Sequence, residues 1–424
     1  MLLFGRSQVH FNFGPSYSKP PLQYWLTTLS LPVFKNRTLA VRIWPLIYGL
    51  FTAVCIGWLA FLLQPHRPWA IVLAIAIAIS CPPFCTGASR GLLDMGLAFF
   101  VTIAFVFAHL ARKHAVWWIG VAVACWLAGL QKVPFVWLMW ILILILRRNS
   151  SMDRKVLMNG WLFVSLLGAA AATLIWPALQ LLNGMSLKDF YHQELVALLG
   201  PQNLGARPYF EIPYRLVITS GYGIFLLIAP FVVLLWRSAS FPQSIRELSI
   251  VCLTIMGILV ITQFRSVRYT LPILPALCLI LAVVFHRLLE QKGVVRKQAA
   301  ILLSLLAVAG LVQAKIEVDY RRKNVENEKQ VAEELGALQE SSMKTVLLNA
   351  QNEGTALLYD SFYLFHGNLR FPLTKYTSEQ IRHSPPTPPV LGVCVADDFP
   401  VVQEVYADPK IQFTLARFIV WRID

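Results

Sequence analysis

The sequence predicts an all-α polytopic membrane protein with about nine or ten transmembrane helices, followed by a small C-terminal α/β soluble domain. Of the 424 residues, 57% are hydrophobic and only 14% are charged, and the mean hydropathy is +0.60. This composition excludes a soluble globular protein, in which about a quarter of the residues are charged. The apolar residues gather in runs that can cross a bilayer as helices, because a helix satisfies its own backbone hydrogen bonds in lipid.

The apolar runs follow one another along residues 1–314, which we expect to form the transmembrane domain. Several are shorter than the roughly 20 residues that a perpendicular span needs. The pair between residues 116 and 146 is interrupted at Gly129–Pro134, which favours two short helices that meet at one membrane surface. The runs cover residues 39–63, 69–87, 91–110, 116–131, 134–146, 157–182, 213–236, 247–263, 269–286 and 298–314.

Residues 315–424 differ in composition, since they hold 12 of the 37 basic and 15 of the 22 acidic residues. We expect strands at 345–349, 390–396 and 412–421 and a helix near 353–366. This segment is predicted to be a small extracytoplasmic domain.

The membrane portion is strongly basic, with 25 Lys and Arg residues against 7 Asp and Glu before residue 315. Arginines clustered in short loops, such as Arg147 and Arg148, favour an outside N-terminus. An anionic ligand would need the basic outer surface that this orientation produces, although anionic lipid headgroups account for it equally well. Nucleic acid is not an expected partner, because the basic residues are spread through membrane loops. The outer basic residues are Lys19, Arg90, Lys132, Arg207, Arg265 and Arg268.

Lys19 precedes the two prolines of a predicted helix start. Proline fits the first helical positions, and the residue before a proline is extended. The free N–H groups and the positive end of the helix dipole, together with Lys19, suit a phosphate. The alternative is a plain helix start without a ligand.

Arg90 and Asp94 are four residues apart at the start of the run 91–110 and are expected to share a helix face. Ionisable groups in membrane spans are costly and tend to be functional or paired. A local Arg–Asp pair that anchors the helix end is the alternative. Lys132, at the break between two runs, either extends harmlessly to the membrane surface or faces a cavity shared with Lys19.

Two further segments are candidates. The outer loop 183–212 contains Glu194 and Tyr209, and it is either a substrate lid or an amphipathic segment on the membrane. Arg265 and Arg268 precede Tyr269 at the start of the run 269–286, where two arginines three residues apart can bind a phosphate. Anchoring at the headgroup boundary is their ordinary alternative role.

These pieces, in this order, resemble the GT-C membrane glycosyltransferases, specifically the aminoarabinose transferase and protein O-mannosyltransferase-like group. The matching segments are Lys19-Pro20-Pro21-Leu22, Arg90-x3-Asp94, Gln131-Lys132-Val133-Pro134, the long outer loop, and Arg265-x2-Arg268-Tyr269 with the prolines that follow. Val133 stands where the family has glycine. The likeness covers about residues 1–315.

The resemblance implies transfer of a sugar from a polyprenyl-phosphate donor to a lipid, glycan or protein acceptor at the outer face of the cytoplasmic membrane. The small tail and the absence of glycosylation-rich outer loops favour a bacterial inner membrane. Membrane lipids would be further partners. A leaving phosphate needs charge stabilisation, and an acceptor hydroxyl needs a carboxylate. The implied roles are phosphate binding by Lys19, Arg265 and Arg268, a cavity lined by Tyr17, Arg90, Lys132 and Tyr269, a lid with Glu194 and Tyr209, and a site acid at Asp94.

The chain departs from the family pattern in two ways. No Asp or Glu precedes Lys19, whereas the family has a catalytic acid in its first outer loop. We expect the reading frame to begin upstream of Met1, with one more helix and the catalytic base; a shortened, inactive protein is the alternative. Ser18 stands where relatives often carry a metal-binding residue, so no cofactor is assigned and a divalent metal stays an open alternative.

Two other functions remain in view. A lipid-linked sugar transporter would share a basic cavity but should show repeated halves with interrupted helices, and no such repeat is visible. A non-catalytic homologue that only binds the lipid carrier is the second. The sugar, the acceptor and the oligomeric state are not encoded in any motif that we recognise.

Overall fold

The computed structural model describes most of the chain in two compact units. The described residues are 10–11, 14–15, 20–35, 37–89, 93–132, twelve single positions between 163 and 216, 222–235, 241–261, 267–338, 343–349, 373–415 and 418–424. The first unit holds the membrane helices as far as Lys315, and the second includes residues 316–424. A short antiparallel pair, β1 (His10–Phe11) and β2 (Gly14–Pro15), precedes the helices.

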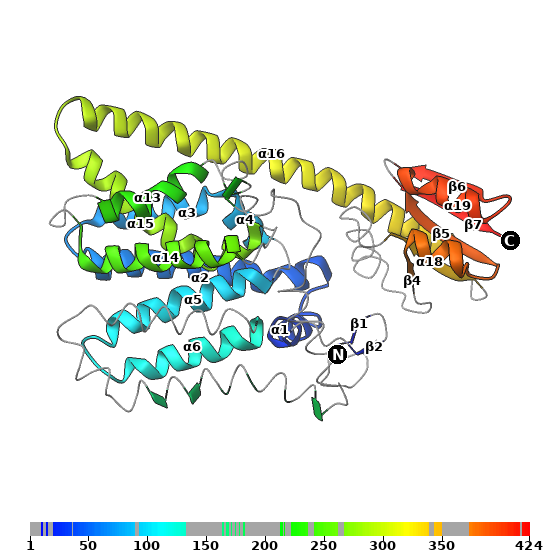
Figure 1. Cartoon of the computed structure of the whole chain (residues 1–424), viewed down its shortest axis with the longest axis horizontal. Coiled ribbons are helices and arrows are strands. Elements are labelled where there is room, and N and C mark those ends of the chain that lie inside the picture. Colours follow the sequence, from blue (N-terminus) through cyan, green and yellow to red (C-terminus); the bar gives the residue numbers. More distant parts are fainter. Residues whose placement is uncertain are drawn as a thin grey trace. The chain divides into compact units, whose positions relative to one another are not determined.

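The first unit is a bundle of apolar helices, drawn from blue to green in Figure 1. It is built from α1 (Leu22–Ser30), α2 (Arg37–Leu63), α3 (Pro68–Ile79), α4 (Pro82–Ser89), α5 (Leu93–Leu110), α6 (Trp117–Gln131), α13 (Gly223–Leu235), α14 (Gln243–Ile261), η4 (Val267–Thr270), α15 (Leu274–Glu290) and the first part of α16 (Val294–Leu338).

The helices are apolar on both their inner and their outer faces. On α2, Ile56 and Ala60 are buried, while Leu50 and Phe61 are 64% and 48% exposed. A water-soluble bundle would place polar residues on the outer face. The chain is therefore a multi-pass membrane protein, in which those outward side chains contact lipid.

Within the described residues, four helices are long and apolar enough to cross a membrane, namely α2, α5, α14 and α16. The bent pair α3–α4 raises the number to five if it counts as one span. The helices α6 and α13 are shorter apolar helices. The runs predicted at 134–146 and, for the most part, 157–182 lie outside the described residues.

Three predicted spans differ in detail from the structure. The run 69–87 is not one straight helix, because α3 and α4 meet at a 65° bend, where Pro82 and Pro83 follow Cys81. The run 269–286 begins as the 3-10 turn η4, and α15 starts only at Leu274, next to Pro275. The run 298–314 does not end the helix, since α16 continues to Leu338.

The second unit contains a five-stranded sheet in the order β4-β3-β5-β7-β6. The central strands β3 (Lys344–Leu348) and β5 (Val390–Val395) are parallel to each other, and β3 is also parallel to β4 (Leu373–Tyr376). The hairpin β6 (Lys410–Leu415) and β7 (Phe418–Ile423) completes the sheet with antiparallel pairing. The single strand predicted at 412–421 was wrong, because this hairpin turns within it; the helix predicted near 353–366 lies outside the described residues.

Alternate side chains of each strand face two separate apolar layers. Leu347 and Val393 pack with Val331 and Leu335 of α16 on one face. Val346 packs on the other face with α18 (Ser378–His383) and α19 (Phe399–Val405). This period of two is what a sheet buried on both sides requires.

Gly392 of β5 leaves room for a tryptophan on the neighbouring strand. It is paired with Trp421 of β7, whose fully buried indole ring lies where a β-carbon at position 392 would stand. A larger residue there must displace the ring, and overpacking of this kind is destabilising.

We therefore expect Gly392→Ala to lower the stability of the C-terminal sheet by about 1–3 kcal/mol. Limited proteolysis of the full chain in detergent, repeated at rising temperature, measures the effect. In the variant, the fragment that follows residue 316 should be degraded at a lower temperature than in the wild-type protein. The matched control is Gly257→Ala in α14, where a β-carbon has nothing within 4 Å and the helix gains propensity. Equal melting of the two variants would contradict the prediction.

Candidate functional site

A buried ion pair joins the start of α5 to the end of α6. Lys132 Nζ donates a hydrogen bond to Asp94 Oδ1 at 2.7 Å, and the side chains are 13% and 5% exposed. Lys132 leaves the helix in an extended conformation, while its backbone N–H still bonds to Ala128 at 2.8 Å. The cation therefore points back across the bundle toward Asp94, in the first turn of α5, where a carboxylate is favoured by the helix dipole.

A third element, η4, brings Tyr269 and Arg268 to the same place. Lys132 Nζ lies 4.2 Å from the centroid of the Tyr269 ring, and Arg268 Cζ lies 5.3 Å from that centroid. One aromatic ring thus contacts two cations, in two contacts of cation–π type. Desolvation lowers the pKa of Arg268, but a hydrogen bond with Tyr269 and the charge of Asp94 raise it, and the net shift is upward.

Arg268 is exposed, whereas Lys132 and Asp94 are nearly enclosed. The group therefore has a buried, paired cation and an accessible one, both in contact with Tyr269. A guanidinium that keeps its charge and faces solvent is well suited to bind a phosphate oxygen.

A second polar contact lies beside the ion pair. Gln131, which is completely buried, donates from Nε2 to the carbonyl of Leu93 at 3.1 Å and to Gln23 Oε1 of α1 at 3.3 Å. Neither Gln23 nor Gln131 was predicted as a site residue. For Gln131 the sequence carried a signal, because it begins the segment Gln131-Lys132-Val133-Pro134 that resembles the GT-C family, whereas Gln23 belongs to no motif.

The structure brings together four of the residues that the sequence predicted, namely Asp94, Lys132, Arg268 and Tyr269. Lys132 is not a lone exposed cation, because its ammonium is bound to Asp94 and its side chain is 13% exposed. Among the described residues, Asp94 is paired with Lys132, which was expected only as a neighbour in the cavity. Arg90 lies outside the described residues, so the alternative Arg90–Asp94 pair stays a prediction.

The remaining predicted site residues lie outside the described residues, and their roles stay predictions. They are Tyr17, Lys19, Arg90, Glu194, Tyr209 and Arg265. Met1, upstream of which we expected the catalytic base, lies outside the described residues as well, so that expectation also stays a prediction. Among the described residues, no group of three or more His, Cys, Asp and Glu side chains is placed to hold a metal ion.

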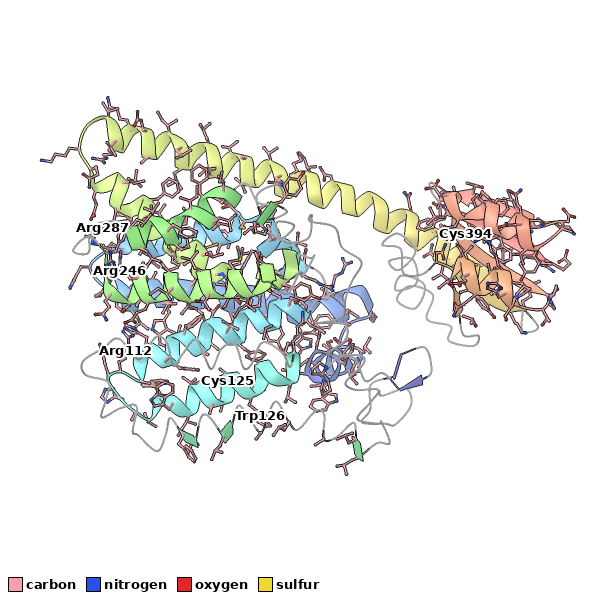
Figure 2. All side chains as sticks on the ribbon, viewed as in Figure 1. Arg112, Cys125, Trp126, Arg246, Arg287 and Cys394 are labelled. Atoms are coloured by element: carbon pink, nitrogen blue, oxygen red, sulfur yellow. The ribbon has the colours of Figure 1, made fainter. Side chains whose placement is uncertain are left out.

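The opposite end of the bundle carries ion pairs of a different kind. Figure 2 shows Arg112, Arg246 and Arg287 at that end, and Arg112 donates to the buried Glu247 at 2.7 Å. Arg67 and Arg287 both contact Glu290, at 2.6 and 3.4 Å. Each of these ion pairs joins residues at or near helix ends and stabilises the packing of those ends.

Solved structures with the same fold are known, although sequence comparison alone finds none. No protein-family model matches the chain, and no curated protein matches its sequence. The crystal structure of ArnT from Cupriavidus metallidurans bound to undecaprenyl phosphate is similar, with a TM-score of 0.71 and 13% identity over 99% of this chain and 91% of that one. The apo structure of the same protein has a TM-score of 0.68 and 13% identity, over 98% and 89% of the two chains. The chain thus has the fold of ArnT, as its resemblance to the GT-C group led us to expect.

Proposed function

We propose that the protein is a membrane glycosyltransferase that moves a sugar from a polyprenyl-phosphate donor to a lipid, glycan or protein acceptor. The observation that carries the proposal is the Asp94–Lys132–Tyr269–Arg268 cluster, formed by the ends of three elements in a bundle with the fold of ArnT. ArnT has been crystallised with undecaprenyl phosphate, so this fold can hold a polyprenyl phosphate.

The roles follow from accessibility and charge. In the proposed reaction, the bond between the anomeric carbon and the phosphate oxygen breaks, the acceptor oxygen bonds to that carbon, and the acceptor proton passes to a base. Arg268 would stabilise the negative charge that develops on the phosphate, together with Lys19 and Arg265. Lys132 and Asp94, which are bound to each other beside the Tyr269 ring, would contact hydroxyl groups of the sugar or acceptor.

The remaining assignments belong to the same proposal. Arg90 and Tyr17 would line the cavity, and Glu194 and Tyr209 would form the lid. The protein would lie in a bacterial inner membrane with residues 1–314 as transmembrane domain and residues 315–424 on the periplasmic side. Placing the cluster at the outer face is supported by the contrast with the anchoring ion pairs at the other bundle end.

A second candidate is a homologue that binds the lipid carrier without transferring a sugar. Asp94, the carboxylate of the cluster, is bound to Lys132 and nearly enclosed, so it is poorly placed to accept a proton from an acceptor. A binding protein would need the cations and the aromatic ring but no free base.

The proposal is tested with the purified protein in proteoliposomes. Undecaprenyl phosphate should bind, and a set of undecaprenyl-phosphate sugars should be consumed when lipid A, glycan and serine-peptide acceptors are supplied. Binding together with sugar transfer supports the enzyme, and binding without transfer or hydrolysis supports the second candidate. Absence of binding would reject both.

The Asp94–Lys132 pair gives a prediction that separates structure from function. Lys132→Met should lower the unfolding free energy by about 3–5 kcal/mol, because it leaves a buried carboxylate unpaired. The double variant Asp94→Leu with Lys132→Met should melt near the wild-type temperature but remain without transfer activity. Differential scanning fluorimetry and the transfer assay measure the two effects; an active double variant would show that the pair is only structural.

Arg268 gives a prediction about the donor phosphate. Arg268→Ala should lower kcat/KM about 10²- to 10³-fold, the loss expected when one stabilising contact to a developing charge is removed. Arg296→Ala is the matched control, because it removes an exposed arginine at the start of α16 and changes the net charge equally. A similar loss in both variants would indicate a general effect of charge at the membrane.

A further inference from the structure

Gln131 contacts two other helices and belongs to the helix end that carries Lys132. Its Nε2 group bonds to Gln23 of α1 and to the carbonyl of Leu93, the first residue of α5. Leu93 precedes Asp94 just as Gln131 precedes Lys132. Two successive residues at the end of α6 thus hold two successive residues at the start of α5.

The orientation of the Gln131 amide is fixed by chemistry. The Leu93 carbonyl can only accept a hydrogen bond, so the nitrogen of the amide must face it. The same nitrogen then requires that Gln23 present its oxygen. Gly96 makes the approach close, because a β-carbon there would stand 2.5 Å from Gln131 Nε2 and 2.9 Å from Tyr48.

The contact with Gln23 extends the arrangement to α1. This helix begins at Leu22, directly after Pro20 and Pro21, and the Pro21 carbonyl accepts its first backbone hydrogen bond from Trp25 at 2.9 Å. The position of α1 therefore sets where the chain before Pro20 can reach. Figure 1 shows α1 next to the end of α6, and the two helices are in contact.

We propose that Gln131 is a positioning residue that couples α1 to the Asp94–Lys132 pair. It does not touch the reacting groups; it fixes the helix that follows Lys19 relative to the helix start that carries Asp94. The coupling between helices rests on the contacts alone, and only its use in binding a polyprenyl phosphate rests on the proposed function.

Replacing Gln131 and replacing Gln23 should loosen different backbone segments. Gln131→Met removes the bonds to both α1 and α5, whereas Gln23→Met removes only the bond to α1. Methionine keeps the length and most of the volume of glutamine, so the loss is chiefly that of the amide. The first variant should loosen residues 22–30 and the start of α5, and the second only residues 22–30.

The experiment is hydrogen–deuterium exchange of the full chain in lipid nanodiscs, with and without undecaprenyl phosphate. In the wild-type protein the lipid should slow exchange at α1 and at the start of α5. In Gln131→Met the free protein should exchange faster at both places, the affinity for undecaprenyl phosphate should fall about tenfold, and the lipid should no longer protect α5. Gln64→Met is the matched control, because Gln64 is also buried but follows α2 outside the cluster.

Each outcome decides the coupling. Unchanged exchange at both places in Gln131→Met would overturn it, and faster exchange in every helix would show a general role in stability instead. If Gln131→Met exchanges faster at these two places but the wild-type protein does not bind undecaprenyl phosphate, the coupling is supported and the proposed function is rejected. Local loosening with weaker binding and loss of protection at α5 would support both.

Discussion

The pairing of one buried charge with another is the constraint on which the site depends. An unpaired carboxylate or ammonium among apolar helices would be very unfavourable, so Asp94 and Lys132 must meet. Their meeting fixes the start of α5 against the end of α6, and these two helices are packed along their length. The pair does more than hold the helices: it also places the ammonium of Lys132 beside the Tyr269 ring.

The ion pairs described above lie at the two ends of the bundle, and the two ends differ in what their cations contact. At one end, Arg112 is paired with Glu247, while Arg67 and Arg287 share Glu290. At the other end, one aromatic ring contacts both a paired lysine and an exposed arginine. What distinguishes the second end is that its exposed cation, Arg268, lies beside an aromatic ring and a buried ion pair, an arrangement suited to one phosphate oxygen.

The transmembrane class, the order of most helices and part of the C-terminal sheet were predictable, because burial of apolar runs depends on local composition. The bend between α3 and α4 and the hairpin within 412–421 were not predicted, because the run of apolar residues continues past the place where the chain changes direction. In the site, Asp94, Lys132, Arg268 and Tyr269 were predicted as site residues, but the ion pair between Asp94 and Lys132 was not. Lys132 is 38 positions from Asp94 in the sequence and reaches it only because the end of α6 lies against the start of α5. Gln131 was not identified as a coupling residue for the same reason: its importance lies in contacts to Leu93 and Gln23, which no sequence period reports.

The low sequence identity to ArnT is consistent with a fold that depends on apolar composition and a site that depends on a few polar contacts. Lipid-facing and core positions can exchange one apolar residue for another at small cost, so a bundle can keep its fold at 13% identity. The positions that cannot be exchanged singly are those that share a buried polar contact, because removing one partner leaves the other unsatisfied. In this chain such contacts join the ends of α1, α5 and α6 around Gln131 and the Asp94–Lys132 pair. The physical case for function therefore rests on these few side chains together with Tyr269 and Arg268, and the many apolar residues serve to bring them to one end of the bundle.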